Sequence, residues 1–174
     1  MMLTMATAKD STKPLIMPGN VRAVHVVSLV DEIDELGSGI RLTKIAEKAG
    51  ADTELLISVV SAAEMLGVIR SESGNLFFTD EGLKLKDVDM ARVIELMRNK
   101  VASIEPFRTA LELASRKGGT TADEVAKTLS ERGIEWHYKP RQNELLVRNL
   151  LIHWAIRAGL LSYDGKNGKF SLPI

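Results

Sequence analysis

Apolar positions recur at helical spacing over residues 20–36, "NVRAVHVVSLVDEIDEL". Val26, Val30 and Ile33 fall on one side of a helix, because an α-helix completes a turn in about 3.6 residues. Gly37-Ser38-Gly39 then ends the run, since glycine readily takes the conformations that close helices. The pattern predicts an amphipathic helix over this segment.

The residues that follow predict a short strand, two helices and a β-hairpin. A short strand is expected over residues 40–42. A helix from Thr43, as N-cap, to Gly50 should follow, and then a longer helix capped by Asp52 and closed by Gly67. "VIRS" and "LFFT" alternate apolar and polar residues around Ser-Glu-Ser-Gly-Asn, which predicts a β-hairpin. A hairpin directly after two helices joined by a tight turn is typical of a winged helix.

A connecting segment then returns to helical spacing. Its apolar residues recur at intervals of four and three, which places them on one stripe: Met90, Ile94, Met97, Val101 and Ile104. The stripe predicts either a helix packed into the core of the chain or the contact helix of a homodimer. The core interpretation is favoured, because a coiled coil needs three or four heptads.

The helix after this connector is expected to be capped by Ser103 and to hold Pro106 in its first turn, where no amide donor is needed. It stops at Gly118-Gly119. "TADE" at 121–124 then has the spacing of a capping box, with the Thr121 hydroxyl and the Glu124 side chain as its members.

The second half repeats a feature of the first half, a helix that ends at a glycine and is followed by a β-hairpin. A long helix from Pro140 ends at Gly159, and "LLSY" and "KFSL" flank Asp-Gly-Lys-Asn-Gly as a second hairpin. Gly67 and Gly159 mark the same point in each copy. The sequence therefore predicts an α+β, mostly α fold of two tandem winged helix-turn-helix units joined by a helical connector. The expected division is a mobile leader (1–17), the first unit (18–86), the connector (87–102) and the second unit (103–174).

Composition narrows the class of protein. The chain has 174 residues, 45% of them apolar, and no cysteine, which fits a reducing cytoplasm and excludes thiol catalysis and cysteine-based zinc sites. No apolar run approaches the roughly 20 residues of a membrane span. The net charge of zero hides an asymmetry: residues 1–90 hold 9 Lys and Arg against 14 Asp and Glu, and residues 91–174 hold 14 against 9. The two halves are therefore expected to prefer different partners.

The core and turn residues resemble those of the C-terminal AAA-associated domain, over roughly residues 17–172. The resemblance is carried by Pro18-Gly19, "LTKIAEKAG" at 42–50, "AAEMLG" at 62–67, "LFFTDEG" at 76–82, "ELMRNKVASIEPFRTALELA" and "AIRAGLLSYDGKNGKFSL". Domains of this family typically follow the nucleotide-binding cassette of ABC ATPases of nitrate, sulfonate, bicarbonate or taurine transporters. The resemblance implies a cytoplasmic regulatory or protein-interaction domain that partners an ABC ATPase and brings no catalytic residues.

No catalytic, cofactor or metal site is expected. "GLLSYDGK" at 159–166 is the nearest string to a phosphate-binding loop, but its second glycine comes one residue late and Asn167 replaces the hydroxyl that would bind magnesium. His25, His137 and His153 are scattered, without the spacing of metal ligands. An enzyme is therefore not expected.

Two surfaces are candidates for partners. In the first unit the helix in the position that reads DNA carries Asp52, Glu54 and Glu64 and no Lys or Arg, so duplex phosphates would repel it. The second unit is basic, and the alternative function is a DNA-binding transcription regulator that uses Arg141, Arg148, Lys166 and Lys169. Pairing of both arginines with Glu144 would instead make this an ordinary solvated face.

The other candidate surface is aromatic. "EWHY" at 135–138 places Trp136 and Tyr138 in a turn region. Tyr and Trp are enriched at partner surfaces. The favoured alternative is that both rings cover the core beneath the loop.

Overall fold

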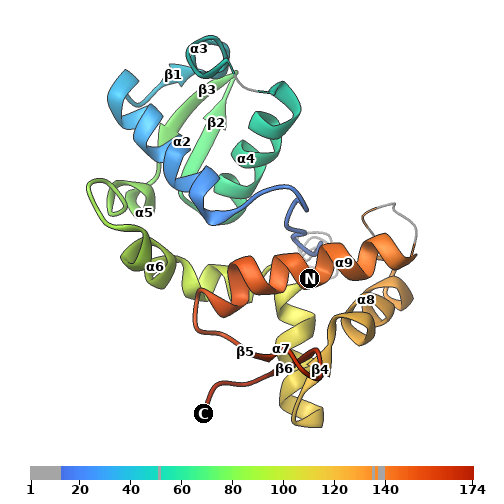
Figure 1. Ribbon diagram of the computed structural model, residues 1–174. Coiled ribbons are helices and arrows are strands. Elements are labelled where there is room, and N and C mark those ends of the chain that lie inside the picture. Colours follow the sequence, from blue (N-terminus) through green and yellow to red (C-terminus); the bar gives the residue numbers. More distant parts are fainter. Residues whose placement is uncertain (1–12, 51, 135, 137–139) are drawn as a thin grey trace, which may run out of the picture.

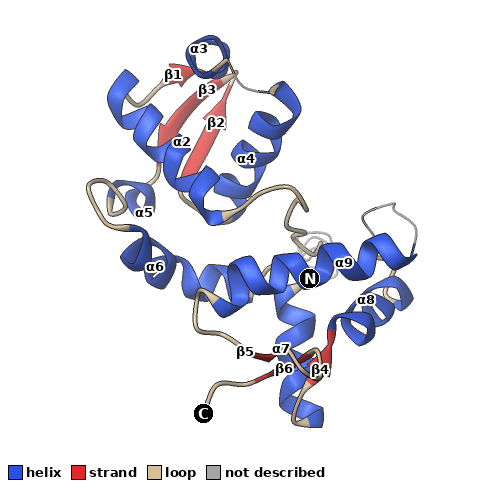
Figure 2. Cartoon of the chain, viewed as in Figure 1, coloured by secondary structure: helices blue, strands red, loops and turns tan. Residues whose placement is uncertain are grey.

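The computed structural model describes residues 13–50, 52–134, 136 and 140–174. Within these ranges the chain is α+β and mostly helical, with two small antiparallel sheets of three strands each (Figure 1, Figure 2). The fold class expected from the hydrophobic pattern is confirmed at this level.

The first half begins with a helix and ends in a hairpin. Its sheet has the strand order β1-β3-β2, so that the short β1 pairs with the second strand of the hairpin, which is the central strand of the sheet. Helices α2, α3 and α4 lie around this sheet in Figure 1. The elements are α2 (Ala23–Leu36), β1 (Ile40–Arg41), α3 (Leu42–Ala49), α4 (Thr53–Met65), β2 (Ile69–Glu72), β3 (Asn75–Phe78) and the short α5 (Asp80–Leu83).

The second half repeats this order of elements after the connecting helix. Its sheet has the strand order β4-β6-β5, which matches the first sheet strand for strand. Its last long helix begins as an α-helix and continues as a π-helix. The elements are α6 (Met90–Ala102), α7 (Phe107–Lys117), β4 (Thr120–Thr121), α8 (Ala122–Glu131), α9 (Pro140–Leu150), η1 (Leu151–Ile156), β5 (Ser162–Asp164) and β6 (Lys169–Ser171).

Gly67 and Gly159 close equivalent helices in the same way. Their φ angles are 74° and 72°, in the left-handed region that glycine adopts without strain. The next amide donates back over the turn in each copy, from Val68 to Ala63 at 3.0 Å and from Leu160 to Ala155 at 2.9 Å. Each turn leads into the first strand of a hairpin, so the predicted equivalence of the two glycines is confirmed.

Two caps lie where the sequence predicts them, since the side chains of Asp52 and Thr121 accept hydrogen bonds from the amides of Glu54 and Glu124, respectively. Thr79 caps the short α5 in the same way and accepts from the amide of Gly82. Glu124 was predicted as the second member of the capping box. Its carboxylate instead accepts hydrogen bonds from the hydroxyl of Thr120 at 3.2 Å and from Nζ of Lys117 at 3.3 Å.

Two caps were assigned wrongly. The N-cap of α3 is Arg41, because β1 runs directly into the helix and leaves Thr43 inside it. Ser103 ends α6 instead of beginning α7, and its hydroxyl donates to the carbonyl of Lys100 at 2.7 Å. The first turn of α7 is held by the buried Glu105, whose carboxylate accepts from the amide and the hydroxyl of Thr109 at 3.0 and 2.8 Å.

The connector stripe is part of the core of one chain. Ile94, Met97, Val101 and Ile104 are buried, and Met90 packs partly buried against the same cluster. This burial favours the core interpretation over a dimer contact along the stripe, because these side chains are already covered within the chain. One continuous cluster of buried residues includes both halves and α6.

The last residues of the expected leader also belong to the fold. The amide of Met17 donates to the carbonyl of Glu105 at 2.9 Å. The amide of Glu105 donates to the carbonyl of Leu15 at 2.8 Å. Met17 is fully buried. Residues 1–12 of the expected leader lie outside the described residues, whereas Leu15 and Met17 are held against Glu105.

Candidate interaction surfaces and pocket

The exposed face of α4 is acidic and apolar. Asp52, Glu54 and Glu64 are exposed, and the side chain of Ile57 is 55% exposed. The Glu64 carboxylate accepts a hydrogen bond from the hydroxyl of Ser71 at 2.9 Å, which ties the helix to the hairpin. Helix α4 contains no Lys or Arg. This face therefore offers an apolar contact between carboxylates.

An apolar groove lies beside this face, between α2, α3 and α4. It has a volume of about 180 Å³ and is lined by His25, Ser28, Leu29, Glu32, Ile45, Ala49, Leu55, Leu56 and Val59. At its rim Lys48 pairs with Glu35 at 2.8 Å and with Glu32 at 3.3 Å. The hydrogen bond that Lys48 donates to Glu35 is the main cause of the raised pKa of Lys48. Desolvation opposes it, and the hydrogen bond to Glu32 adds to the rise. The rim thus combines fixed charges with an apolar floor.

His25 has a structural role at the start of α2. Its Nδ1 accepts the backbone N–H of Arg22 at 2.9 Å and so satisfies a donor that helix geometry leaves unpaired. Desolvation by burial, and then the charge of Arg22, lower the pKa of His25. Both effects favour the neutral ring, which the hydrogen bond requires. The absence of metal-ligand spacing around His25 agrees with this role.

The basic residues of the second half lie on two elements. Arg141 and Arg148 are exposed on α9 and line one shallow pocket of about 300 Å³ together with Glu144 and Leu145. No ion pair joins Glu144 to either arginine in the described part of the chain. The two arginines are thus brought together, as the seven-residue spacing predicted.

The two lysines lie on the β5–β6 hairpin and do not line that pocket. Lys166 is in the turn, where its amide donates to Oδ1 of Asp164 at 3.0 Å. Lys169 begins β6, opposite both Asp164 and Thr121 in the two strand pairings. The four predicted contacts are therefore split between a helix and a hairpin.

Trp136 covers the core of the chain. Its ring is partly buried, and Nε1 donates to the carbonyl of Met17 at 2.9 Å. The polar end of the indole is therefore already engaged within the chain. This favours the core-covering alternative over the partner surface for Trp136, whereas Tyr138 and His137 lie outside the described residues.

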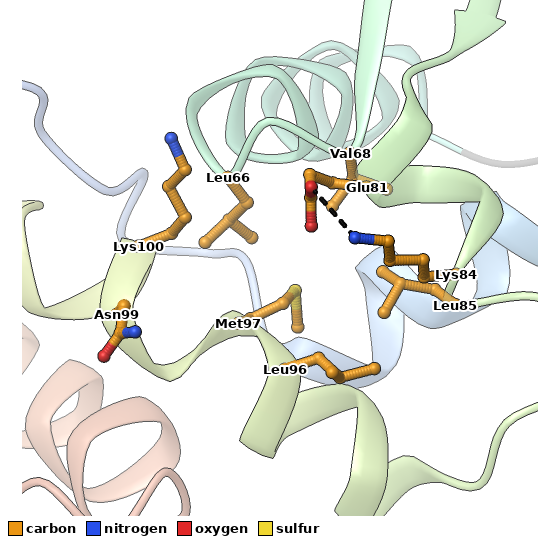
Figure 3. A pocket seen from close by; sticks show the side chains of 9 residues that line it. All are labelled: Leu66, Val68, Glu81, Lys84, Leu85, Leu96, Met97, Asn99 and Lys100. Carbon is orange, nitrogen blue, oxygen red and sulfur yellow. Dashed lines mark hydrogen bonds and ion pairs between the residues drawn. The ribbon is translucent and has the colours of Figure 1, made fainter.

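A pocket that sequence reasoning missed lies between the first half and α6 (Figure 3). It has a volume of about 340 Å³, within the usual range of small-molecule sites. Its lining comes from three segments of the chain: Leu66, Val68, Glu81, Lys84, Leu85, Leu96, Met97, Asn99 and Lys100. No local motif could have identified it, because these residues meet only when α6 folds against α4 and α5.

Among the described residues, no group of three or more His, Cys, Asp or Glu side chains is placed to hold a metal ion. No described helix has the length and apolar character needed to cross a bilayer.

The described residues form two helical halves that have the same order of elements, and each half contains a small antiparallel sheet of three strands. The family model of the C-terminal AAA-associated domain matches residues 43–164, from α3 into β5, and the chain belongs to this family. No curated protein and no solved structure matches the chain.

Proposed function

We propose that this chain is a non-catalytic regulatory domain that binds the ATPase subunit of an ABC transporter in the cytoplasm. Its family is named for association with ATPases of the AAA class, which supports a nucleotide-hydrolysing partner. The chain itself has none of the lysine and hydroxyl spacing that holds nucleotide phosphates and magnesium. The partner would therefore supply the nucleotide chemistry.

The architecture proposed for this role is a pair of winged helix-turn-helix units. Both halves have the order helix, strand, helix, helix, strand, strand, and in both the first strand pairs with the last. In such a unit α4 and the α9–η1 helix occupy the position that contacts a macromolecule. Helix α6 joins the two units.

The single observation that carries a protein partner is the exposed face of α4. Ile57 is exposed between the carboxylates of Glu54 and Glu64, and no cation lies on that helix. Duplex phosphates would be repelled by such a face, whereas a protein with an apolar and basic patch would complement it. Truncation of side chains near the centre of an interface, where the partner excludes water, usually costs the most binding energy.

The test is complex formation with a purified ABC ATPase subunit encoded beside the gene of this chain. Light scattering should detect the complex, and Ile57→Asp should weaken it about tenfold or more. Leu145→Asp, on α9, is the matched control because Leu145 is 45% exposed. Equal loss in both variants would reject the α4 surface, and no complex with any such ATPase would reject the function.

DNA binding by the second half is the second candidate function. It is supported by Arg141 and Arg148, which are exposed in one shallow pocket and not neutralised by Glu144. These guanidinium groups are free to meet phosphates. The zero net charge of the whole chain favours the protein partner over this alternative.

A further inference from the structure

The pocket between the first half and α6 has an apolar floor. Leu66 and Met97 point toward each other across it in Figure 3. Both side chains are buried, as are Val68 and Leu85. Leu96 stands at the rim and is 41% exposed. A hydrocarbon chain of a ligand would cover the exposed side chain of Leu96 beside this floor, and removal of apolar surface from water favours binding.

The charges around this floor sum to a positive value. Lys84 pairs with Glu81 at 3.3 Å, so these two charges neutralise each other. Lys100 lies on the opposite side of the pocket in Figure 3, and its Nζ makes no ion pair with any described carboxylate. Asn99 adds an amide that can donate a hydrogen bond. The polar groups therefore favour an anion.

We propose that this pocket binds a small amphipathic organic anion, a carboxylate with a short hydrocarbon chain. The chain lies against Leu66 and Met97, and the carboxylate lies beside Lys100. This site is separate from the α4 face, and its test needs no partner protein. Most sites for small molecules have this composition, an apolar lining with a few placed polar groups, and many lie between structural units.

Binding at this site would act on α6, which contacts the same turn in both halves. Lys100 lies over Gly67, with its Cε 3.6 Å from the position that a Cβ would take there. Arg98, on the same helix, donates to the carbonyl of Gly159 at 3.1 Å. A ligand held between α6 and the end of α4 would therefore stabilise the contact between the first half and the connector.

The test uses octanoate as the probe and follows the backbone amides of the whole chain by NMR. Octanoate should shift resonances around Leu66, Leu85 and Met97 in a saturable way. Butyrate, which has the charge with a short chain, and octan-1-ol, which has the chain without charge, should each bind about tenfold more weakly or worse.

Variants then separate charge from structure. Lys100→Gln should weaken octanoate about tenfold, and Lys100→Arg should stay within about threefold of the original chain. Lys127→Gln, at an exposed lysine of α8, should change nothing. Thermal melting of each variant checks the fold, because Lys100 also lies at the C-terminal end of α4, where a cation is stabilising.

Any of four results would overturn the proposal. One is the lack of saturation by octanoate up to about 10 mM. Another is a set of shifts that falls outside the pocket. The third is unchanged binding of octanoate by a folded Lys100→Gln variant, and the fourth is equal binding of octan-1-ol and octanoate.

Discussion

At the scale of single residues, His25 couples stability to pH. Its lowered pKa means that the folded chain takes up a proton less readily than the unfolded chain, whose value is near 6.5. As pH falls below about 6.5 the unfolded state binds more protons, so the free energy of unfolding should decrease. His153 contributes in the same direction, because desolvation, Arg22 and Arg157 lower its pKa as well.

The measurement is chemical unfolding between about pH 7.5 and 5.5, where few carboxylates titrate. His25→Gln should reduce the loss of stability, because a glutamine oxygen can still accept the amide of Arg22 without titrating. His25→Gln with His153→Gln should reduce it further. A double variant with the pH slope of the original chain would contradict the assignment. Hydrogen bonds from Arg132 and then Arg116 lower the pKa of Glu112. Protonation of Glu112 therefore decreases the free energy of unfolding only at pH values near or below 4.5.

Gly82 is required for a different reason, the close approach of two backbone segments. A Cβ on Gly82 would overlap the carbonyl oxygen of Val68, which also accepts the Thr79 hydroxyl at 3.0 Å. Gly82→Ala should therefore lower the free energy of unfolding by about 1–3 kcal/mol, the usual cost of overpacking. Gly165→Ala is the control, since its Cβ would find only an ordinary contact of 3.9 Å with Tyr163. Equal stability of the two variants in urea would show that the turn after β3 can shift.

At the scale of elements, α6 is a core helix. Met97 is only 3% exposed and belongs to the buried cluster that includes both halves. Met97→Ala should destabilise the chain by about 2–5 kcal/mol, whereas Leu96→Ala, at the exposed neighbour, should cost much less.

The midpoint of unfolding should not depend on protein concentration, because the stripe is covered within one chain. A midpoint that rises with concentration would restore the dimer interpretation.

The elements could largely be predicted from sequence because their signals are local. Apolar spacing and glycine stops depend on a few neighbouring residues, and Gly67 and Gly159 illustrate this. Ser103 was misassigned because a serine between two helices suits either end by spacing alone. The structure resolves this choice through the long-range bonds of Glu105 with Leu15 and Met17.

The candidate sites were less predictable, since they depend on packing. The seven-residue spacing of Arg141 and Arg148 placed them on one face, but the groove of α2, α3 and α4 needs three helices to exist. The pocket around Lys100 likewise joins residues more than 30 positions apart, from Leu66 to Lys100. Periodicity identifies which side of a helix is buried and does not tell which helix covers it.

At the scale of the whole molecule, the two halves are joined tightly and differ in charge. Nε1 of the buried Trp154 donates to the carbonyl of Val21 at 3.0 Å. The centroid of the Trp154 ring lies 6.5 Å from the centroid of the Phe107 ring. The acidic and basic surfaces are thus held on one shared core. A partner on α4 and a polyanion on α9 would therefore bind to faces of a single body, and a change on one face should leave the other intact.

DNA affinity tests this separation and decides between the two candidate functions. An interaction domain should bind duplex DNA only in the non-specific range, with a Kd no tighter than about 10⁻⁶ to 10⁻⁴ M at physiological salt. Arg141→Glu with Arg148→Glu should abolish that binding and its salt dependence, because fewer counterions are released when fewer phosphates are contacted. Glu54→Gln with Glu64→Gln, on the acidic face, is the matched control and should have little effect. Selection from random duplexes gives the opposing result: one sequence bound at nanomolar strength, about a thousandfold tighter than unrelated DNA, would mark a specific regulator. In that case the basic half would be the functional site, and the Ile57 face would hold a partner that assists DNA binding.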